Sequence, residues 1–257
     1  MEAQNTPEKE TAIEKALDLL DFFIPYNREL SSSEITSLCG YHRATSSRMI
    51  KTLERKGYLY QNPDTKKYRL GYKVPMLNSA ITSSLASDLS SIGLPVLMKL
   101  REQTDETVVL DTITYDSTVP SFVLRGKGPI FIDIMVGTPV PWNTSPGLLA
   151  ILAFSDAERR QPFFLQPMVS ITDTSIIDMD VYLAELEETA KRGYAVSVDD
   201  PFKGATSFCA PVFDHNNSPI AAISVSAPSD RARENREFLT GELLKAAAEF
   251  SKRLSLK

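Results

Sequence analysis

Apolar residues recur at helical spacing near the start of the chain. From Ile13 to Ile24 they lie three or four positions apart, which predicts an amphipathic helix that Pro25 ends. We expect its apolar stripe to pack behind a later helix of the same domain. The stripe consists of Ile13, Ala16, Leu17, Leu20, Phe23 and Ile24.

The stretch 31–60 predicts two further helices joined by a tight turn at Gly40, because glycine tolerates the positive φ of such turns. The second helix has two different sides. Met49, Ile50 and Leu53 form an apolar side, since positions three and four apart share a helix face. The opposite side carries small residues and cations, namely Ala44, Ser47, Arg48, Lys51 and Arg55.

The charge of this region has one sign. Residues 41–73 hold nine basic and two acidic side chains, a local balance of +7, whereas a solvated helix face normally mixes both signs. The whole chain carries −5, and residues 74–257 alone carry −7. Affinity for nucleic acid is therefore expected only in the N-terminal part.

A hairpin is predicted directly after the cationic helix. Gly57 ends the helix, and two short strand patterns then surround a polar turn at 61–65, with Lys66 and Lys67 placed to touch phosphates. This order predicts a winged helix-turn-helix DNA-binding domain over residues 1–73. An ordinary amphipathic helix and hairpin with a solvated basic face is the alternative. The residues expected at double-stranded DNA are Arg43, Thr45, Ser46, Ser47, Arg48, Lys51, Lys66 and Lys67.

Residues 74–92 carry a narrow apolar seam, which predicts a linker helix that meets another helix, such as its own copy in a second subunit. A partly buried spacer is the alternative. Gly93 and Pro95 are expected to interrupt this helix before a further one ends near Thr104. The seam consists of Leu77, Ile81, Leu85, Leu89 and Ile92.

The remainder, 93–257, is expected to form one effector-binding and oligomerisation domain. Its pattern changes from helical spacing to alternation and short apolar runs, which predict strands at 107–113, 121–125, 129–136, 195–198, 206–213 and 220–226. Helices are predicted at 146–154, 178–192 and 237–254. The fold class is therefore α+β, with a mixed α/β domain and a central antiparallel sheet after the winged helix.

Composition narrows the function classes. The chain is 42% hydrophobic, lacks an apolar run of membrane-spanning length, and starts with a polar, acidic segment, so we expect a globular cytoplasmic protein without a membrane partner. Two cysteines, Cys39 and Cys209, and two histidines provide no zinc-ligand spacing and no disulfide framework. No metal and no cofactor are expected.

Three segments of the second domain are candidates for the wall of a cavity: 142–147, 199–209 and the strand holding Ser224 and Ser226. The two serines share one strand face, and a helix start near Ser145 suits a carboxylate. Each has a structural alternative: a solvent-facing sheet for the serines, and the core for Cys209 and Trp142. The candidate effector-binding residues are Trp142, Asn143, Ser145, Gly147, Asp199, Cys209, Ser224 and Ser226.

Three segments resemble the IclR family of bacterial transcription regulators: AIEKALDLLDFF with EITSLCGYHRATSSRMIKTLERKGYL, then VGTPVPWNTSPGLLAILA, then GYAVSVDD with FCAPVFDHNNSPIAAISVSAP. The resemblance implies a GAF-like C-terminal domain that binds a small organic acid, and a dimer or dimer of dimers on a partly palindromic operator. Asn143 stands where the family usually has histidine, and Gly147-Leu148 where it has Gly-Lys.

We therefore expect a sequence-specific transcription regulator controlled by a small organic-acid or aromatic effector, and not an enzyme. Two other hypotheses remain. Cys209 is a candidate nucleophile or redox sensor with His215 as base, although its neighbours are apolar and reactive thiolates need a cation or a helix N-terminus. The second hypothesis is a GAF-like metabolite sensor that acts mainly through protein contacts.

Overall fold

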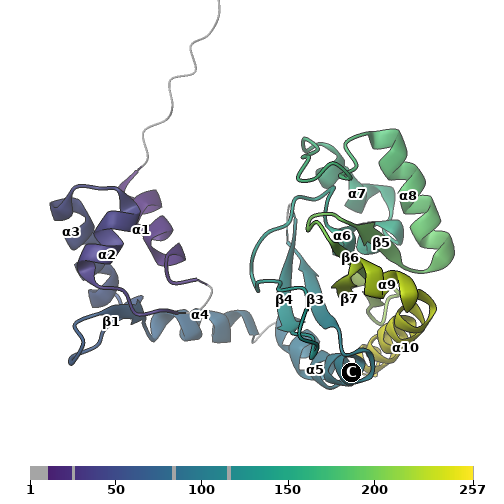
Figure 1. Cartoon of the computed structure of the whole chain (residues 1–257), viewed down its shortest axis with the longest axis horizontal. Helices are drawn as coiled ribbons and strands as arrows, with labels where there is room; N and C mark the ends of the chain where they lie inside the picture. The colour runs from purple at the N-terminus through teal and green to yellow at the C-terminus, as the bar shows by residue number, and fades with distance from the viewer. Residues whose placement is uncertain (1–10, 25–26, 83–84, 115–116, 257) are drawn as a thin grey trace, which may run out of the picture. The chain divides into compact units, whose positions relative to one another are not determined.

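The structure is a computed structural model that describes residues 11–24, 27–82, 85–114 and 117–256 (Figure 1). It divides into two compact units, one ending at residue 84 and the other beginning at Leu85. The first unit is helical with a two-stranded hairpin, and the second contains a five-stranded antiparallel sheet. The predicted α+β class is confirmed. Among the described residues, no helix is both long enough and apolar enough to cross a membrane.

The N-terminal unit begins with three helices whose ends are set by local chemistry. The Ser31 hydroxyl accepts a hydrogen bond from the Glu34 N–H at 3.2 Å, and the Ser31 N–H donates to the Glu34 carboxylate at 2.7 Å, a capping box. Gly40 ends that helix with φ of 65°. The elements are α1 (Ala12–Asp21), α2 (Ser32–Cys39), α3 (Arg43–Arg55), β1 (Leu59–Gln61), β2 (Tyr68–Leu70) and α4 (Lys73–Thr82).

Helix α1 and the residues after it bury only part of the predicted stripe, namely Phe23 and, partly, Ala16 and Leu20. Leu19 and the nearby Phe23 are fully buried with Ile35, Ile50 and other residues of the small core. Three residues of the predicted stripe remain exposed instead: Ile13, Leu17 and Ile24. The prediction was wrong for these three because the line through Leu19 and Phe23, not the longer series, faces α3. Pro25 lies outside the described residues.

The predicted break at Gly93 and Pro95 is also wrong, because α5 (Leu85–Thr104) runs through both residues. Gly93 has a packing role: a Cβ built there would lie 2.3 Å from the ring of Phe250. The second half of the predicted linker thus belongs to the C-terminal unit, where Leu89 is buried. Leu77 is exposed, and the side chains of Ile81 and Leu85 lie outside the described part.

The C-terminal sheet has the strand order β4-β3-β7-β6-β5, and all its neighbours are antiparallel. The strands are β3 (Thr107–Ile113), β4 (Thr118–Leu124), β5 (Ala195–Val198), β6 (Ala205–Phe213) and β7 (Pro219–Pro228). The remaining helices are α6 (Pro146–Ala153), α7 (Ala157–Phe164), α8 (Met179–Arg192), α9 (Ser229–Glu234) and α10 (Arg236–Leu254). The short helices α7 and α9 were not predicted.

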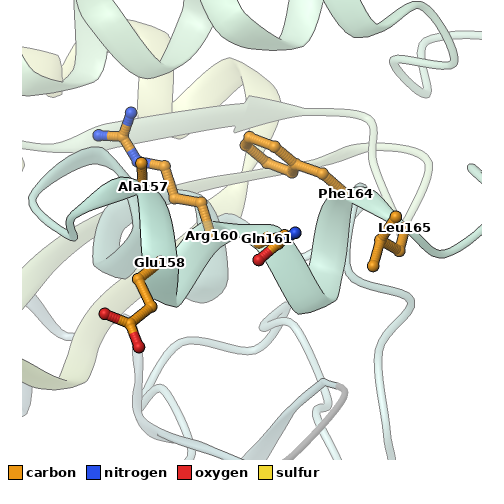
Figure 2. A pocket seen from close by; sticks show the side chains of 6 residues that line it. All are labelled: Ala157, Glu158, Arg160, Gln161, Phe164 and Leu165. Carbon is orange, nitrogen blue, oxygen red and sulfur yellow. The ribbon is translucent and has the colours of Figure 1, made fainter.

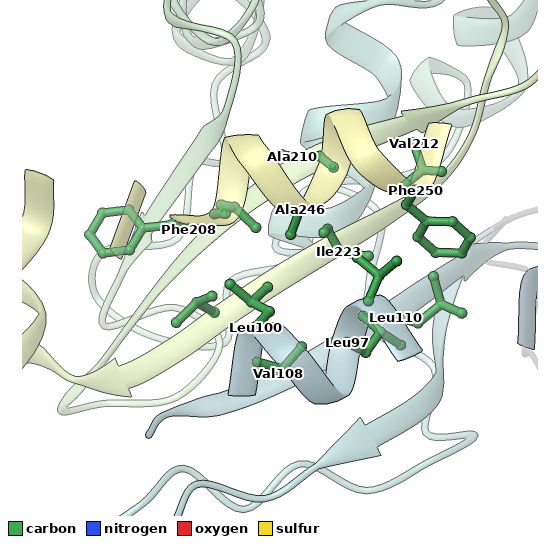
Figure 3. Packing of buried hydrophobic residues seen from close by; sticks show 14 of the residues in the cluster. Leu97, Leu100, Val108, Leu110, Phe208, Ala210, Val212, Ile223, Ala246 and Phe250 are labelled. Carbon is green, nitrogen blue, oxygen red and sulfur yellow. The ribbon is translucent and has the colours of Figure 1, made fainter. Parts of the chain in front are cut away.

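Helices cover both faces of this sheet (Figure 1). On one face α5 and α10 pack over alternate residues of β6 and β7, among them Phe208, Ala210 and Ile223 (Figure 3). On the other face α6 packs over the intervening residues Cys209 and Ala222. Because side chains alternate along a strand, each strand contributes to two separate cores.

Residues 129–136 do not form the predicted strand. Their backbone is held by side chains instead: Thr107 donates to the Ile132 carbonyl at 2.7 Å, and Arg231 donates to the Ile130 carbonyl at 2.8 Å. The chain meets the edge strand β4 just after this segment, where the Gly137 N–H donates to the Pro120 carbonyl at 2.7 Å.

We predict that Gly93→Ala lowers the free energy of unfolding by about 1–3 kcal/mol, because the added methyl group overlaps the buried ring of Phe250. This outcome opposes the higher helix propensity of alanine. The matched control is Gly241→Ala in α10, where a Cβ meets nothing within 4 Å, so that variant should gain about 0.5–1 kcal/mol. Chemical denaturation of both variants measures the difference, and equal stabilities would contradict the packing argument.

Candidate functional site

Helix α3 separates an apolar face from a cationic one, as its pattern predicted. Met49, Ile50 and Leu53 are buried in the small core of the N-terminal unit. Arg43, Thr45, Arg48 and Lys51 are exposed, and Ser47 is half-buried at the edge of the same surface. Together these five residues define the outer face of α3.

Ser46 does not belong to that outer face. Its side chain is fully buried. Ser46 lies three, four and seven positions before Met49, Ile50 and Leu53, and these spacings place residues on one side of a helix. Its hydroxyl has no hydrogen-bond partner among the described residues. The expectation that Ser46 contacts DNA is therefore corrected.

The cations of this surface form no close ion pair with a described carboxylate. Within the part of the chain that the structure describes, Arg43, Arg48, Lys51 and the wing lysines Lys66 and Lys67 form no salt bridge. Salt bridges of the described residues occur instead in the C-terminal unit, as between Arg125 and Asp133. An unpaired cationic face is suited to phosphates supplied by a partner.

The hairpin between β1 and β2 is held in one shape by Asn62 and Glu29. The Asn62 carbonyl accepts from the backbone N–H of Asp64 at 2.9 Å, and its amide donates to Glu29 at 3.1 Å. Thr65 donates to the other Glu29 oxygen at 3.1 Å. The Asn62 hydrogen bond also lowers the pKa of Glu29. The wing that carries Lys66 and Lys67 is thus a fixed loop.

A small cavity lies in the C-terminal unit between the sheet and the N-terminus of α6. Its volume is about 40 Å³, well below the several hundred Å³ of a typical ligand pocket. The sheet side is lined by Val109, Asp111, Ser207, Ser224 and Ser226. The start of α6 contributes Ser145, Pro146 and Gly147, and Pro201 with the half-exposed Phe202 closes another side.

Four of the predicted effector residues line this cavity: Ser145, Gly147, Ser224 and Ser226. The alternation argument placed Ser224 and Ser226 on one strand face, and both are buried there, not exposed to solvent. Their neighbour Ser207 on β6 lies in the predicted wall segment 199–209 but was not among the predicted effector-binding residues. Ser226 and Ser207 share a hydrogen bond of 2.7 Å, while Ser145 caps α6 through the Leu148 N–H at 3.1 Å.

Trp142 and Asn143 do not line the cavity. Trp142 is buried against Phe164 and Tyr182, and its indole donates to the Pro167 carbonyl at 3.1 Å. The Asn143 side chain binds the backbone of the segment that follows α7 at two places. Its amide donates to the carbonyls of Val169 and Ile176, and its carbonyl accepts from the Val169 N–H at 3.0 Å. The side-chain polar atoms of both residues therefore have hydrogen-bond partners within the protein, and both residues stabilise the fold.

Asp199 also has a local role. Its carboxylate accepts hydrogen bonds from the Gly204 N–H at 2.8 Å and from Ser229 at 3.2 Å, which shapes the turn that enters β6. Cys209 is fully buried beneath the cavity, next to Ser224 on β7. Burial, and secondarily the charge of Asp111, raises the pKa of the Cys209 thiol. Cys209 thus lacks the thiolate character that a nucleophile or redox sensor requires, and His215 is exposed in a turn.

Asp111 is the functional candidate that the sequence reasoning missed. It lies on β3, is 8% exposed, and accepts no hydrogen bond from any described residue through its carboxylate. Burial raises its pKa to about 7. A Cβ built on Gly147 would lie 2.8 Å from its Oδ2 atom, so the carboxylate sits against the start of α6. The available signal was a lone acid inside a run of apolar strand residues.

A larger hollow of about 490 Å³ runs along α7 (Figure 2). Its lining comes from one short helix and the residue that follows it. The guanidinium of Arg160 is used elsewhere, because it donates to the carbonyls of Leu152 and Ala153 at the end of α6. This surface hollow gathers fewer converging polar groups than the sheet cavity, which is the better ligand site.

Comparison with known proteins gives a family match in each of the two units. The family model of the bacterial transcriptional regulator IclR C-terminal domain matches residues 82–252, and that of the IclR helix-turn-helix domain matches residues 12–63. The chain belongs to the IclR family of transcriptional regulators. The resemblance that its motifs indicated is confirmed.

Relatives extend over nearly the whole chain. The HTH-type transcriptional regulator XynR of Escherichia coli K12 is 27% identical over 86% of this chain and 87% of its own length. The Escherichia coli repressor AllR is 26% identical over 96% and 91%. The crystal structure of the Thermotoga maritima IclR has a TM-score of 0.78 at 26% identity, covering 95% of this chain and 98% of the other. These IclR-family relatives are transcriptional regulators.

We predict that Asp111 makes stability depend on pH. Its pKa is raised in the folded protein, so the unfolded chain loses the proton first as the pH rises from about 4 to about 7, and the folded state loses stability over that range. Relative to wild type, Asp111→Asn should become more stable by up to about 4 kcal/mol at pH 8, and the gain should shrink toward pH 4.

Urea denaturation of wild type and Asp111→Asn at pH 4.5, 6 and 8 measures this difference. Asp180→Asn, which changes an exposed carboxylate on α8, is the matched control and should show no such trend. A stability difference between Asp111→Asn and wild type that is the same at all three pH values would rule out a buried, titrating carboxylate.

Proposed function

We propose that this chain is a sequence-specific DNA-binding transcriptional regulator in the cytoplasm, in which Arg43, Thr45, Ser47, Arg48 and Lys51 meet the major groove. The observation that carries the proposal is the outer face of α3, which is cationic, unpaired and opposite the buried face. A helix of this kind places side chains against base edges. Lys66 and Lys67 on the wing would contact backbone phosphates.

The C-terminal unit is proposed to bind a small organic-acid or aromatic effector in the cavity at the start of α6. The buried serines of β7 and the backbone N–H groups in the first turn of α6 support this role, because they are polar groups that converge in an otherwise apolar domain. A structural neighbour, an IclR homolog of Microbacterium hydrocarbonoxydans, was crystallised with 4-hydroxybenzoate. That compound belongs to the proposed class.

Self-association as a dimer or dimer of dimers is part of the proposal, and it implies a partly palindromic operator. Support comes from the apolar residues that α1 leaves exposed, Ile13 at 74% and Leu17 at 57%. Effector binding would act through the linker seam from Leu77 to Leu89 by favouring one spacing of two DNA-binding domains. A ligand achieves this only through different affinities for the two arrangements.

The first experiment captures sheared genomic DNA of the source organism on the purified protein and sequences what is retained. We expect wild type to recover a short palindromic motif and Arg48→Ala to lose it, since one good base contact discriminates by about 1–3 kcal/mol. Ser46→Ala is the matched control: it changes the same helix at a buried position and should keep the motif.

Two results would count against this function. If wild type retains no motif even after metabolite extract is added, the DNA-binding proposal fails. Weak binding that does not depend on salt would instead favour a GAF-like metabolite sensor whose winged helix contacts proteins, because neutralising phosphates produces a steep salt dependence.

Removal of a wing lysine should have a different signature. We predict that Lys67→Ala weakens binding to the recovered operator and to unrelated DNA by similar factors, and reduces the slope of log affinity against log salt concentration by about one. Arg233→Ala, which removes an exposed cation from α9, is the control and should leave the slope unchanged. Fluorescence anisotropy titrations at several salt concentrations test this, and a loss confined to the operator would assign Lys67 to base recognition.

A further inference from the structure

Asp111 occupies the place at which a carboxylate ligand would be expected. The N-terminus of α6 attracts anions through its free N–H groups and its dipole, and the Asp111 carboxylate already lies against Gly147 at that position. An effector carboxylate directed there would approach a second carboxylate. At this point the cavity is therefore not expected to select its ligand by binding a carboxylate.

No described group donates a hydrogen bond to the Asp111 carboxylate, which lines the cavity. Its partners in the sheet are Pro120 on β4, which has no N–H, and Ala222 on β7. The facing residue of α6 is Gly147, and Cys209 on β6 is the only other titratable group facing it among the described residues. Among the described residues that line the cavity there is no lysine, arginine or histidine.

Three of the serine hydroxyl groups that line the cavity already have other partners. Ser207 and Ser226 form a pair at 2.7 Å, and Ser145 bonds Thr118 at 2.6 Å while it caps α6. Asp111 is thus an almost fully buried acid that faces the cavity and accepts no hydrogen bond from a described residue. A buried polar group left without a partner is costly, and a ligand that provides the donor removes that penalty.

Resting on the proposed effector role of this cavity, we propose that Asp111 is its specificity-determining residue and selects a ligand that presents a hydroxyl or amino group to it. The effector class is therefore a hydroxylated or amino-bearing small molecule, such as a hydroxy acid or a phenol. Any carboxylate on the same molecule lies away from the start of α6.

The test uses matched compounds that differ only in the donor group. Benzoate, 4-hydroxybenzoate and 4-aminobenzoate form one set, and propionate, lactate and alanine form another; binding to the full chain is measured by thermal shift and by calorimetry. We expect at least one donor-bearing compound to bind wild type roughly tenfold to a hundredfold more tightly than its parent acid. The hydroxyl and amino members distinguish the two kinds of donor.

Asp111→Ala should remove this preference. Asp111→Asn, whose amide oxygen still accepts a hydrogen bond but carries no charge, should weaken it, while Asp180→Asn should keep it. Two variants are used so that a folding defect in one leaves the other informative, and circular dichroism verifies both. The inference is overturned if the parent acids bind wild type as well as the donor-bearing compounds, if no compound of either set binds, or if both Asp111 variants retain the preference. Genomic DNA capture tests the regulator function independently of these outcomes.

Discussion

Burial of helix α6 against the sheet is the constraint on which the ligand cavity depends. Seven of its eight residues, from Gly147 to Ala153, are buried, so the helix fills the space between the sheet and α8. Pro146 at the first helical position and the Ser145 cap determine where it begins. The first turn therefore comes to lie over the polar strip of the sheet formed by Asp111, Ser224 and Ser226, and the cavity is the space left between them.

Glycine is required at the point of closest approach. Any side chain at position 147 would collide with the Asp111 carboxylate, since even a Cβ would lie 2.8 Å from one of its oxygens. The contact brings a carboxylate to the positive end of a helix, which partly offsets the penalty of burying it. The pKa of about 7 indicates that this compensation is incomplete. The site thus holds an acid that lacks a partner.

The N-terminal unit depends on a similar division between the two sides of one helix. Its small core includes Leu53, Ile50 and Met49 of α3, and the polar Ser46 is buried on the same side of that helix. That burial fixes the rotation of α3 and therefore which side chains remain outside. The unpaired cations of the outer face and the wing held by Asn62 and Glu29 are consequences of how this core is packed.

The amino-acid sequence by itself determined the features that depend on neighbours within a few positions. It was sufficient to predict the cationic face of α3, the wing, the family and five of the C-terminal strands. It also placed Ser224 and Ser226 on the same face of one strand. These features could be predicted because helix and strand periodicities are local.

Only the tertiary structure decided which of those residues face a cavity. Asn143 and Asp199 form hydrogen bonds with the backbone, and Trp142 packs in the core. Asp111 is a buried acid because Gly147 of α6, which is 36 positions further along the chain, lies over it. Desolvation depends on elements that are distant in the chain, so the lone acid in an apolar strand pattern did not by itself show that α6 would cover it.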